Sequence, residues 1–286
     1  MRIQRVSSKW AKTKAILRNH SLSAYIPDTR KYEFSVLNEM LDLYNVVYIK
    51  PDRGTYGNGV MRAEQRTVNL TPSPQNNDTE SEENKENETK LVYILRQGKT
   101  AEIFNTTGAL DEAIKKLIKD RPYLIQKGIE LLQHHNRPFD LRVLVQKNPL
   151  GAWETTGMLG RVAAPHKIVT NYHNGGRIKS VKPLLSEHMN TANTTLTMNQ
   201  LRTLGIQMAW QLESVYSGIK EIGLDVAIDE HHDLWVLEIN TLPSIVIFKI
   251  FPDKSIYRKI HRYAASYGRV KNSSVTTKAV FKKRSR

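Results

Sequence analysis

The segment from residue 223 to residue 240, GLDVAIDEHHDLWVLEIN, constrains the fold more than any other part of the chain. Two β-prone runs, at 223–228 and 234–240, flank the polar residues 230–233, and this pattern predicts an antiparallel hairpin. If Asp229 pairs with Leu234, Asp225 lies directly opposite Glu238, and a tighter turn gives the same register. Asn240 follows two residues later and therefore lies on the same face as Glu238.

Two carboxylates and an amide oxygen would thus converge on one face of the hairpin. Opposed like charges destabilise a sheet unless something neutralises them. An all-oxygen set of ligands suits a hard cation, Mg²⁺ or Mn²⁺. The alternative interpretation of the same pattern is the solvent-facing polar side of an ordinary antiparallel sheet.

The rest of the chain mixes helices with strands. Helical spacing of apolar residues predicts helices at 8–19, 33–44 and 110–119, and a capping-box pattern predicts that the longest helix opens at Thr197. Short β-prone or alternating runs predict strands at 46–50, 60–68, 91–95, 123–126 and 141–146. Strands mixed with helices and hairpins favour the α+β class over a doubly wound parallel sheet.

Residues 71–90 form a low-complexity segment with six acidic residues, two lysines and no hydrophobic residue. Such a segment buries nothing that offsets its ordering entropy, so we expect a disordered insertion at a loop between two strands. The chain contains no cysteine, which excludes a disulfide framework, a thiolate zinc site and a cysteine nucleophile. No apolar run approaches ~18 residues, and no signal peptide is evident, so we expect a cytoplasmic protein without a transmembrane segment.

The net charge is +15, and residues 269–286 contribute seven basic residues and no acidic one. We expect this tail to be disordered and solvated. A second interpretation is that the tail attaches the protein to a polyanionic surface, any nucleotide site then being incidental. No nucleic-acid-binding motif accompanies the tail, so specific nucleic-acid recognition is not expected.

A glycine-rich loop follows the strand that ends at Lys50. Glycines at positions 54, 57 and 59 let a backbone approach phosphate oxygens, and the lysine adds a positive charge. The lysine precedes the glycines, so the loop is not a P-loop. An ordinary glycine-rich hairpin turn explains the same residues equally well.

Taken in order, these elements resemble the ATP-grasp superfamily over nearly the whole chain. The matching features are a lysine that opens a helix, a strand lysine before a glycine loop, a hinge strand, two arginines and a closing acidic hairpin. They correspond to Lys9, Lys50 with Gly54, Gly57 and Gly59, residues 124–129, Arg142, Arg161, and Asp225 with Glu238 and Asn240. The amino-acid sequence at residues 9–30, 50–59 and 137–147 resembles that of the YheC/YheD endospore coat-associated group.

The resemblance implies two α+β subdomains with ATP between them, in a domain spanning residues 1–268 that lacks most of the usual preceding N-terminal domain. It implies that the two lysines and the glycine loop hold the nucleotide phosphates. It also implies that backbone groups of Gln126, Lys127 and Gly128 contact adenine, with Ile49, Ile125 and Leu237 around the ring. Lys127 stands where an acidic residue is common, so we expect Glu130 to contact the ribose.

The same resemblance implies chemistry. Asp225, Glu238 and Asn240 would bind Mg²⁺ or Mn²⁺, and Arg142 and Arg161 would stabilise the transferring phosphoryl group. The implied activity is an ATP-dependent carboxylate–amine or carboxylate–thiol ligase that forms an acyl phosphate on a spore or envelope component. The alternative is a nucleotide-binding structural protein of the spore coat without turnover. The carboxylate and the amine are not identified by the sequence.

Overall fold

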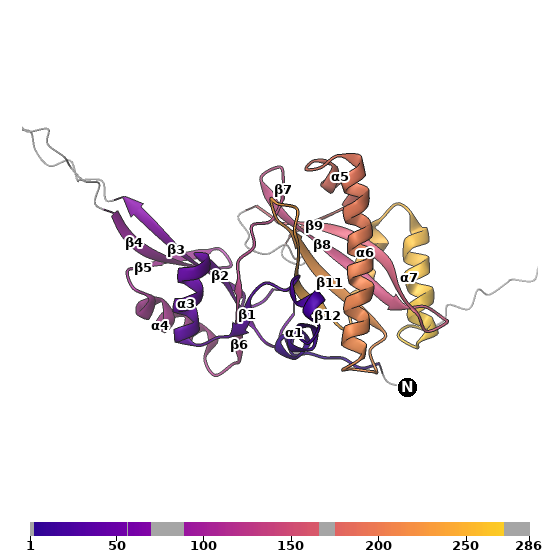
Figure 1. Ribbon diagram of the computed structural model, residues 1–286, viewed down its shortest axis with the longest axis horizontal. Coiled ribbons are helices and arrows are strands. Elements are labelled where there is room, and N and C mark those ends of the chain that lie inside the picture. The colour runs from indigo at the N-terminus through magenta and orange to yellow at the C-terminus, as the bar shows by residue number, and fades with distance from the viewer. Residues whose placement is uncertain (1–2, 56, 70–88, 166–174, 272–286) are drawn as a thin grey trace, which may run out of the picture.

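The computed structural model describes residues 3–55, 57–69, 89–165 and 175–271. Its described part contains two antiparallel sheets with helices packed on them, which confirms the α+β class (Figure 1). The first sheet has the order β1 (Thr29–Lys31), β6 (Tyr123–Lys127), β2 (Val46–Pro51), β3 (Met61–Asn69), β4 (Thr89–Gln97) and β5 (Thr100–Phe104). The second has the order β10 (Arg177–Lys179), β9 (Trp153–Val162), β8 (Arg137–Lys147), β11 (Glu221–Ile228) and β12 (Leu234–Asn240), and β7 (Gln133–His134) pairs with β8.

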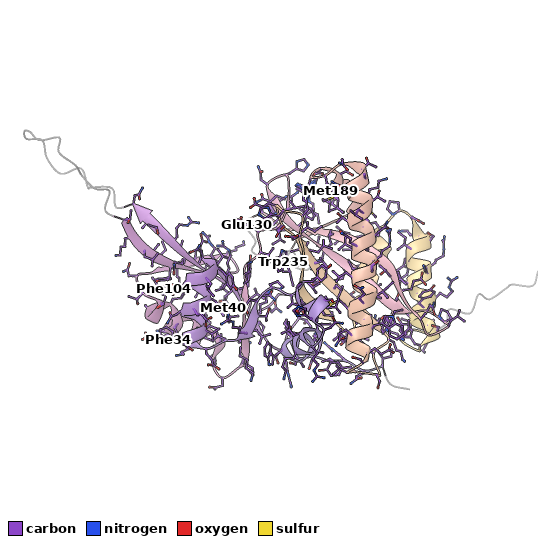
Figure 2. The ribbon with its side chains drawn as sticks, in the orientation of Figure 1. Phe34, Met40, Phe104, Glu130, Met189 and Trp235 are labelled. Atoms are coloured by element: carbon purple, nitrogen blue, oxygen red, sulfur yellow. The ribbon has the colours of Figure 1, made fainter. Side chains whose placement is uncertain are left out.

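The first subdomain has its own hydrophobic core between its sheet and two helices, α3 (Phe34–Tyr44) and α4 (Thr107–Ile118). Leu37, Met40 and Leu41 recur at helical spacing and are fully buried, so one face of α3 packs on the sheet. Figure 2 shows Met40 and Phe104 within this subdomain. Alternate residues of each strand point into this core, and the residues between them point to the opposite face of the sheet.

The second sheet is covered on both faces. The helices α1 (Lys9–Leu17), α2 (His20–Ser23), α5 (Val181–Ser186) and α6 (Thr191–Glu213) supply the core on one face. The short helix η2 (Val246–Ile250) and α7 (Lys254–Ser266) supply the core on the other. In β8 the alternation is strict: Leu141, Val143 and Val145 belong to the core under α6, and Leu144 belongs to the core under α7.

The chain crosses between the subdomains twice, and the two crossings lie side by side. The N-terminal helices pack against the second sheet, the chain then enters the first sheet at β1, and it returns after β6. Thr29 in β1 pairs directly with Gln126 in β6. The Gln126 side chain donates to Thr29 Oγ1 at 2.8 Å. The connection between the subdomains is therefore double-stranded.

The predicted start of the longest helix is wrong. Helix α6 begins at Thr191, six residues before Thr197, because Asn190 accepts a hydrogen bond from the N–H of Asn193 at 2.9 Å and caps the helix. Thr197 is instead buried within the helix. An asparagine cap without a following Glu or Gln carries no capping-box signature, so the second pattern in the sequence was the more visible one.

The two segments predicted to be disordered fall largely outside the described residues, which omit 70–88 and 272–286. At their described edges the prediction is wrong. Thr89 and Lys90 pair with Asn69 and Val68 as the first residues of β4. Arg269 donates to Glu221 and to the carbonyl oxygen of Pro243, so it belongs to the folded domain. None of the described helices is both long enough and apolar enough to cross a membrane.

Candidate functional site

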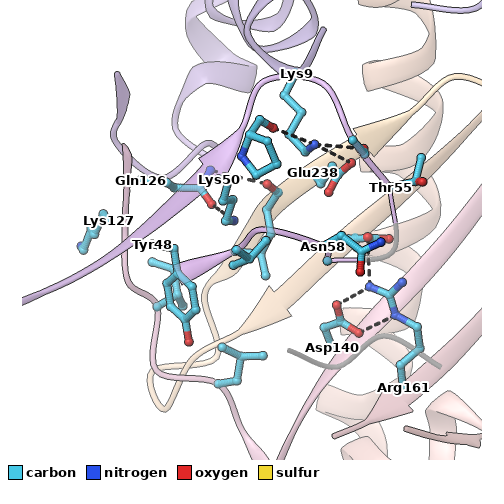
Figure 3. A pocket seen from close by; sticks show the side chains of 18 residues that line it. Lys9, Tyr48, Lys50, Thr55, Asn58, Gln126, Lys127, Asp140, Arg161 and Glu238 are labelled. Carbon is cyan, nitrogen blue, oxygen red and sulfur yellow. Dashed lines mark hydrogen bonds and ion pairs between the residues drawn. The ribbon is translucent and has the colours of Figure 1, made fainter. Parts of the chain in front are cut away.

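A cleft with about 830 Å³ of empty space, part of it open to solvent, lies between the two subdomains (Figure 3). Most of the residues singled out in the sequence line it. These are Lys9, Lys50, Gly54, Gly57, Gln126, Lys127, Arg161, Asp225 and Glu238. Gly59, Gly128, Glu130, Arg142 and Asn240 are not among its lining residues.

The first lysine is positioned by the cap of α1. Ser8 caps the helix, and Asp52 Oδ1 accepts from both Ser8 Oγ at 2.9 Å and the Trp10 N–H at 2.8 Å. This ties the start of α1 to the residues that follow β2. The Lys9 ammonium group donates to the carbonyl oxygens of Pro51 and Gly54 and lies 3.9 Å from Glu238 Oε1. Lys9 therefore links the glycine loop to the acidic hairpin.

The second lysine projects from β2 into the cleft. Its ammonium group donates to Gln126 Oε1 at 2.5 Å, and Gln126 is anchored in turn to Thr29. Burial lowers the pKa of Lys50 from its ordinary value to about 8. Its charged form is thus poorly solvated in the protein alone, and an anion in the cleft would stabilise it.

The alternation of β2 contradicts one expected contact. Ile49 and Ile125 are fully buried in the core of the first subdomain, on the face opposite Lys50. The residues of β2 that share the cleft with Lys50 are Tyr48 and Pro51. Since successive residues of a strand point to opposite faces, Ile49 and Lys50 cannot both face the nucleotide. This alternation is visible in the sequence and would have identified Tyr48.

The glycine loop approaches the cleft with three residues of positive φ, the first being Gly54 at 154°. Gly57 and Gly59 have φ values of 73° and 76°, a region that other residues rarely adopt. Gly57 lines the cleft, together with Thr55 and Asn58 (Figure 3). Gly59 faces the sheet, where an added Cβ would lie 2.8 Å from Tyr123 Oη. Gly59 thus shapes the loop, whereas Gly57 forms part of its inner surface.

The hinge strand is engaged differently from the expectation. The N–H of Lys127 donates to Asp28 O, and the N–H of Gly128 donates to Val46 O, both at 2.8 Å. These two donors, predicted to face adenine, are used within the protein. An added Cβ at Gly128 would lie 2.6 Å from Val46 Cγ1, so close packing explains this glycine.

Beyond the hinge, Ile129 and Leu131 line the cleft, and Glu130 between them is exposed outside the lining (Figure 2). Its predicted contact with ribose remains a prediction. The Lys127 ammonium group lies 5.3 Å from the ring centre of Tyr44 and 5.1 Å from that of Trp235. These rings come from α3 and β12, so Lys127 makes cation–π contacts with both subdomains.

The acidic hairpin has the predicted pairing at its functional end. Asp225 lies opposite Glu238, and Gly223 lies opposite Asn240. A register shift after Asp225 then places Val226 opposite Val236, which leaves Leu237 as the extra residue of a bulge. Bulges change the direction of side chains. This one accounts for the presence of two consecutive residues, Leu237 and Glu238, in the cleft lining.

Both predicted arginines bind Asp225. Arg142 Nε donates to Asp225 Oδ1 at 2.5 Å, and an Arg161 nitrogen lies 3.0 Å from Asp225 Oδ2. Arg161 also binds Asp140, which the sequence reasoning did not assign to the site, through Nε at 2.8 Å. Burial alone would raise the pKa of Asp225, but the two guanidinium groups outweigh burial and hold it below its ordinary value.

A divalent cation fits these carboxylates only with oxygen ligands from elsewhere. Among the described residues, no group of three or more acidic, histidine or cysteine side chains gathers as a metal centre. Mg²⁺ usually takes one or two protein carboxylates and completes its shell with water and phosphate oxygens. Each carboxylate oxygen has two lone pairs, so Asp225 can ligate a cation while it accepts from the arginines. Asp225 and Glu238, which both line the cleft, suit that kind of shared site, whereas Asn240 is outside the lining.

Electrostatically, the cleft suits a polyphosphate ligand. Lys9, Lys50 and Arg161 place positive charge along it, and Glu238 offers a carboxylate 27 % exposed. Cations bind phosphate oxygens directly, and a carboxylate-bound divalent cation bridges them. The apolar side chains of Val60, Leu131 and Leu237 give the cleft an apolar surface on which a flat ring can pack.

Comparisons with known proteins point to one protein family. A sequence model of the family described as YheC/D-like ATP-grasp matches residues 3–270. The endospore coat-associated protein YheD of Bacillus subtilis (strain 168) is 25% identical over 248 residues, which cover 84% of this chain and 49% of YheD. The endospore coat-associated protein YheC of the same strain is 21% identical over 237 residues, which cover 82% of this chain and 60% of YheC. The chain thus spans about half to three fifths of these relatives.

Solved structures resemble most of the fold, as one example shows. The D-cycloserine synthetase DcsG superposes with a TM-score of 0.51, covering 91% of this chain and 70% of the synthetase, at 9% sequence identity. At that identity the likeness concerns the fold alone.

Proposed function

Because this chain belongs to the YheC/D-like ATP-grasp family, we propose that it binds ATP together with Mg²⁺ or Mn²⁺ in the cleft between its subdomains. The observation that carries the proposal is the convergence of Lys9, Lys50 and Arg161 on the paired carboxylates Asp225 and Glu238. The two carboxylates and Asn240 would hold the metal ion. When bound, the ion neutralises charge on the phosphate oxygens.

The proposed reaction joins a carboxylate to an amine or a thiol. A carboxylate oxygen attacks the γ-phosphorus of ATP, and the bond from that phosphorus to the bridging oxygen of ADP breaks. The amine or thiol then attacks the carbonyl carbon of the acyl phosphate, releases phosphate and loses a proton. No protein nucleophile takes part, so catalysis consists of positioning and electrostatic stabilisation.

The two arginines take different roles in this proposal. Arg161 lines the cleft and would contact the transferring phosphoryl group. Arg142 is outside the lining and donates to Asp225, so it acts through that carboxylate as a positioning residue. This revises the expectation that both arginines contact the phosphoryl group.

The names of the relatives support an acceptor that belongs to the spore or its envelope, and association of this chain with the spore coat. They equally support a second function, nucleotide binding in a structural coat protein without turnover. One observation favours this second candidate: both arginines and Asp225 neutralise one another within the protein. In that case binding ATP would stabilise the fold and drive no reaction.

Calorimetric titration with ATP, with and without Mg²⁺, tests the binding site. We expect wild type to bind ATP more tightly with Mg²⁺, and Glu238→Gln to lose most of that difference because one metal-binding charge is removed. Glu230→Gln is the matched control, since Glu230 lies in the turn of the same hairpin with its side chain 73 % exposed. Equal ATP affinity with and without Mg²⁺ in wild type would contradict the metal site.

Release of ADP in mixtures of amino acids and cell-wall peptides tests the reaction. For a ligase, Arg161→Lys should lower turnover by roughly 10²-fold, because an ammonium group cannot hold Asp140 and Asp225 and contact the phosphoryl group at the same time, as the guanidinium group can. ATP affinity should change little. Absence of ADP formation in wild type with every mixture would favour the structural alternative. Turnover that survives Arg161→Lys unchanged would refute the assigned phosphoryl-transfer site.

A further inference from the structure

Lys12 is a buried lysine one turn after Lys9, and it has no role in the site described so far. Lys12 is 5% exposed. Within the described ranges, its ammonium group has no hydrogen-bond partner in the protein and no carboxylate within 4.0 Å, although it is not among the fully buried atoms that lack a partner and so keeps some contact with solvent. An ammonium group carries three N–H donors and a full charge, and leaving these without partners in a protein interior is costly. The position therefore needs an explanation that packing does not supply.

Lys12 lines a smaller cavity that continues from the main cleft. The two spaces share Lys9, Lys50, Gln126, Leu237 and Glu238 as lining residues. Three lysines thus surround the smaller cavity, against a single carboxylate, Glu238. This excess of positive charge attracts an anion.

The other two lysines already have acceptors. Lys9 donates to the carbonyl oxygens of Pro51 and Gly54, and Lys50 donates to Gln126. Lys12 lies on the face of α1 shared by positions i and i+3, so it points toward the same side of the helix as Lys9. Its three donors are consequently available to a group that enters from the cleft.

We propose that Lys12 binds a phosphate oxygen, as a third cationic group at the inner end of the cleft. The phosphate belongs either to the chain of a bound nucleotide or to free inorganic phosphate. The nucleotide source rests on the proposed function, whereas the free-anion source does not. In both cases the ligand supplies the acceptors that the protein itself lacks at this position.

The test compares Lys12→Met with Lys14→Met. Methionine has similar length and no charge, and Lys14 is an exposed lysine on the same helix. Calorimetry measures the dissociation constants of ATP, ADP, adenosine, pyrophosphate and inorganic phosphate, all without a divalent cation. Urea unfolding of the unliganded variants measures whether the fold is affected.

We expect Lys12→Met to weaken binding of ATP about 10-fold or more, since hydrogen bonds to a charged group account for changes of that order. Binding of adenosine should stay within about twofold, and Lys14→Met should leave all constants within about twofold. The urea midpoint of unliganded Lys12→Met should be equal to or above that of wild type, because an unpartnered buried charge is replaced by an apolar group.

The outcomes separate the two sources and the two proposals. If wild type binds no nucleotide but binds pyrophosphate or phosphate in a manner lost in Lys12→Met, the proposed function fails and the Lys12 site stands with a free anion as its ligand. Equal weakening of ATP and adenosine, a lowered urea midpoint with lost binding, or unchanged affinity for every anion would overturn the Lys12 site.

Discussion

Replacing Asp140 by asparagine should test whether the buried ion network holds the functional end of the second sheet together. Asp140 and Arg161 have side chains 3% and 5% exposed. Asparagine keeps the shape of the carboxyl group but offers one acceptor oxygen and turns an N–H₂ group toward the guanidinium donors. Arg161 then retains one hydrogen bond to residue 140 and its contact with Asp225 at 3.0 Å.

The expected loss of stability follows from those remaining contacts. Removing one partner of a buried ion pair costs about 3–5 kcal/mol when it leaves the other charge uncompensated. Asp225 still compensates part of the Arg161 charge, so we expect a smaller loss than this range, about 2–3 kcal/mol. With a dependence on urea of about 2–3 kcal/mol per molar, the unfolding midpoint should fall by roughly 1 M.

The matched control is Glu154→Gln, which makes the same chemical change in a half-exposed ion pair. Glu154 and Lys259 have side chains 34% and 38% exposed, and pairs of this kind contribute less than about 1 kcal/mol. Urea denaturation followed by circular dichroism measures both variants. A midpoint shift for Asp140→Asn no larger than that for Glu154→Gln would refute the reasoning from burial.

Three further predictions concern the hinge, the titration of the cleft and the insertion. Gly128→Ala should lower the free energy of unfolding by about 1–3 kcal/mol, measured by urea denaturation, because its Cβ would lie 2.9 Å from the Val46 carbonyl oxygen and β2 must shift. Burial lowers the Lys50 pKa to about 8 from an ordinary 10.5, so between these two pH values the unfolded chain binds one more proton at this residue than the folded protein does. The free energy of unfolding should therefore rise from pH 8 to 10.5, while the ATP affinity measured by calorimetry falls. Lys50→Met should lose part of both trends. Replacing residues 70–88 by a two-residue Asn-Gly turn should change the free energy of unfolding, measured by urea denaturation, by less than about 1 kcal/mol, because Asn69 and Thr89 are directly paired. A larger loss would show that the removed residues contribute to the fold.

Local patterns predicted about half of the elements and the pairing of the two acidic residues, because these depend on residues close together in the sequence, whereas strand β9 and helix α7 were not predicted. Counting from the polar turn placed Asp225 opposite Glu238, and the structure confirms it. The starting point of the count was wrong, since Leu234 pairs with Ile228 and not with Asp229, and the bulge after Asp225 makes up the one-residue difference. Nothing in the composition of the strands marks where that difference is accommodated.

Contacts between distant segments could not be predicted in this way. Asp225 binds Arg142 because β11 lies next to β8, and Arg161 reaches the same carboxylate because β9 lies on the other side of β8. The order of strands in a sheet is a property of the whole fold. The N–H groups of Lys127 and Gly128 were assigned to a ligand for the same reason: their acceptors, Asp28 and Val46, are about 80–100 residues earlier in the chain.

The paired crossings at Thr29 and Gln126 make the first subdomain an insertion into the second. Residues 29–127 leave and re-enter the second subdomain at two neighbouring positions, about 5 Å apart as in any antiparallel pair. All buried members of the first core lie between Leu37 and Ile125, so this part carries its own core. A short linker between Asp28 and Gly128 could therefore close the second subdomain without it, and the excised piece could be joined end to end. The protein is in this sense divisible into one part that carries the glycine loop and Lys50 and another that carries the acidic hairpin and both arginines.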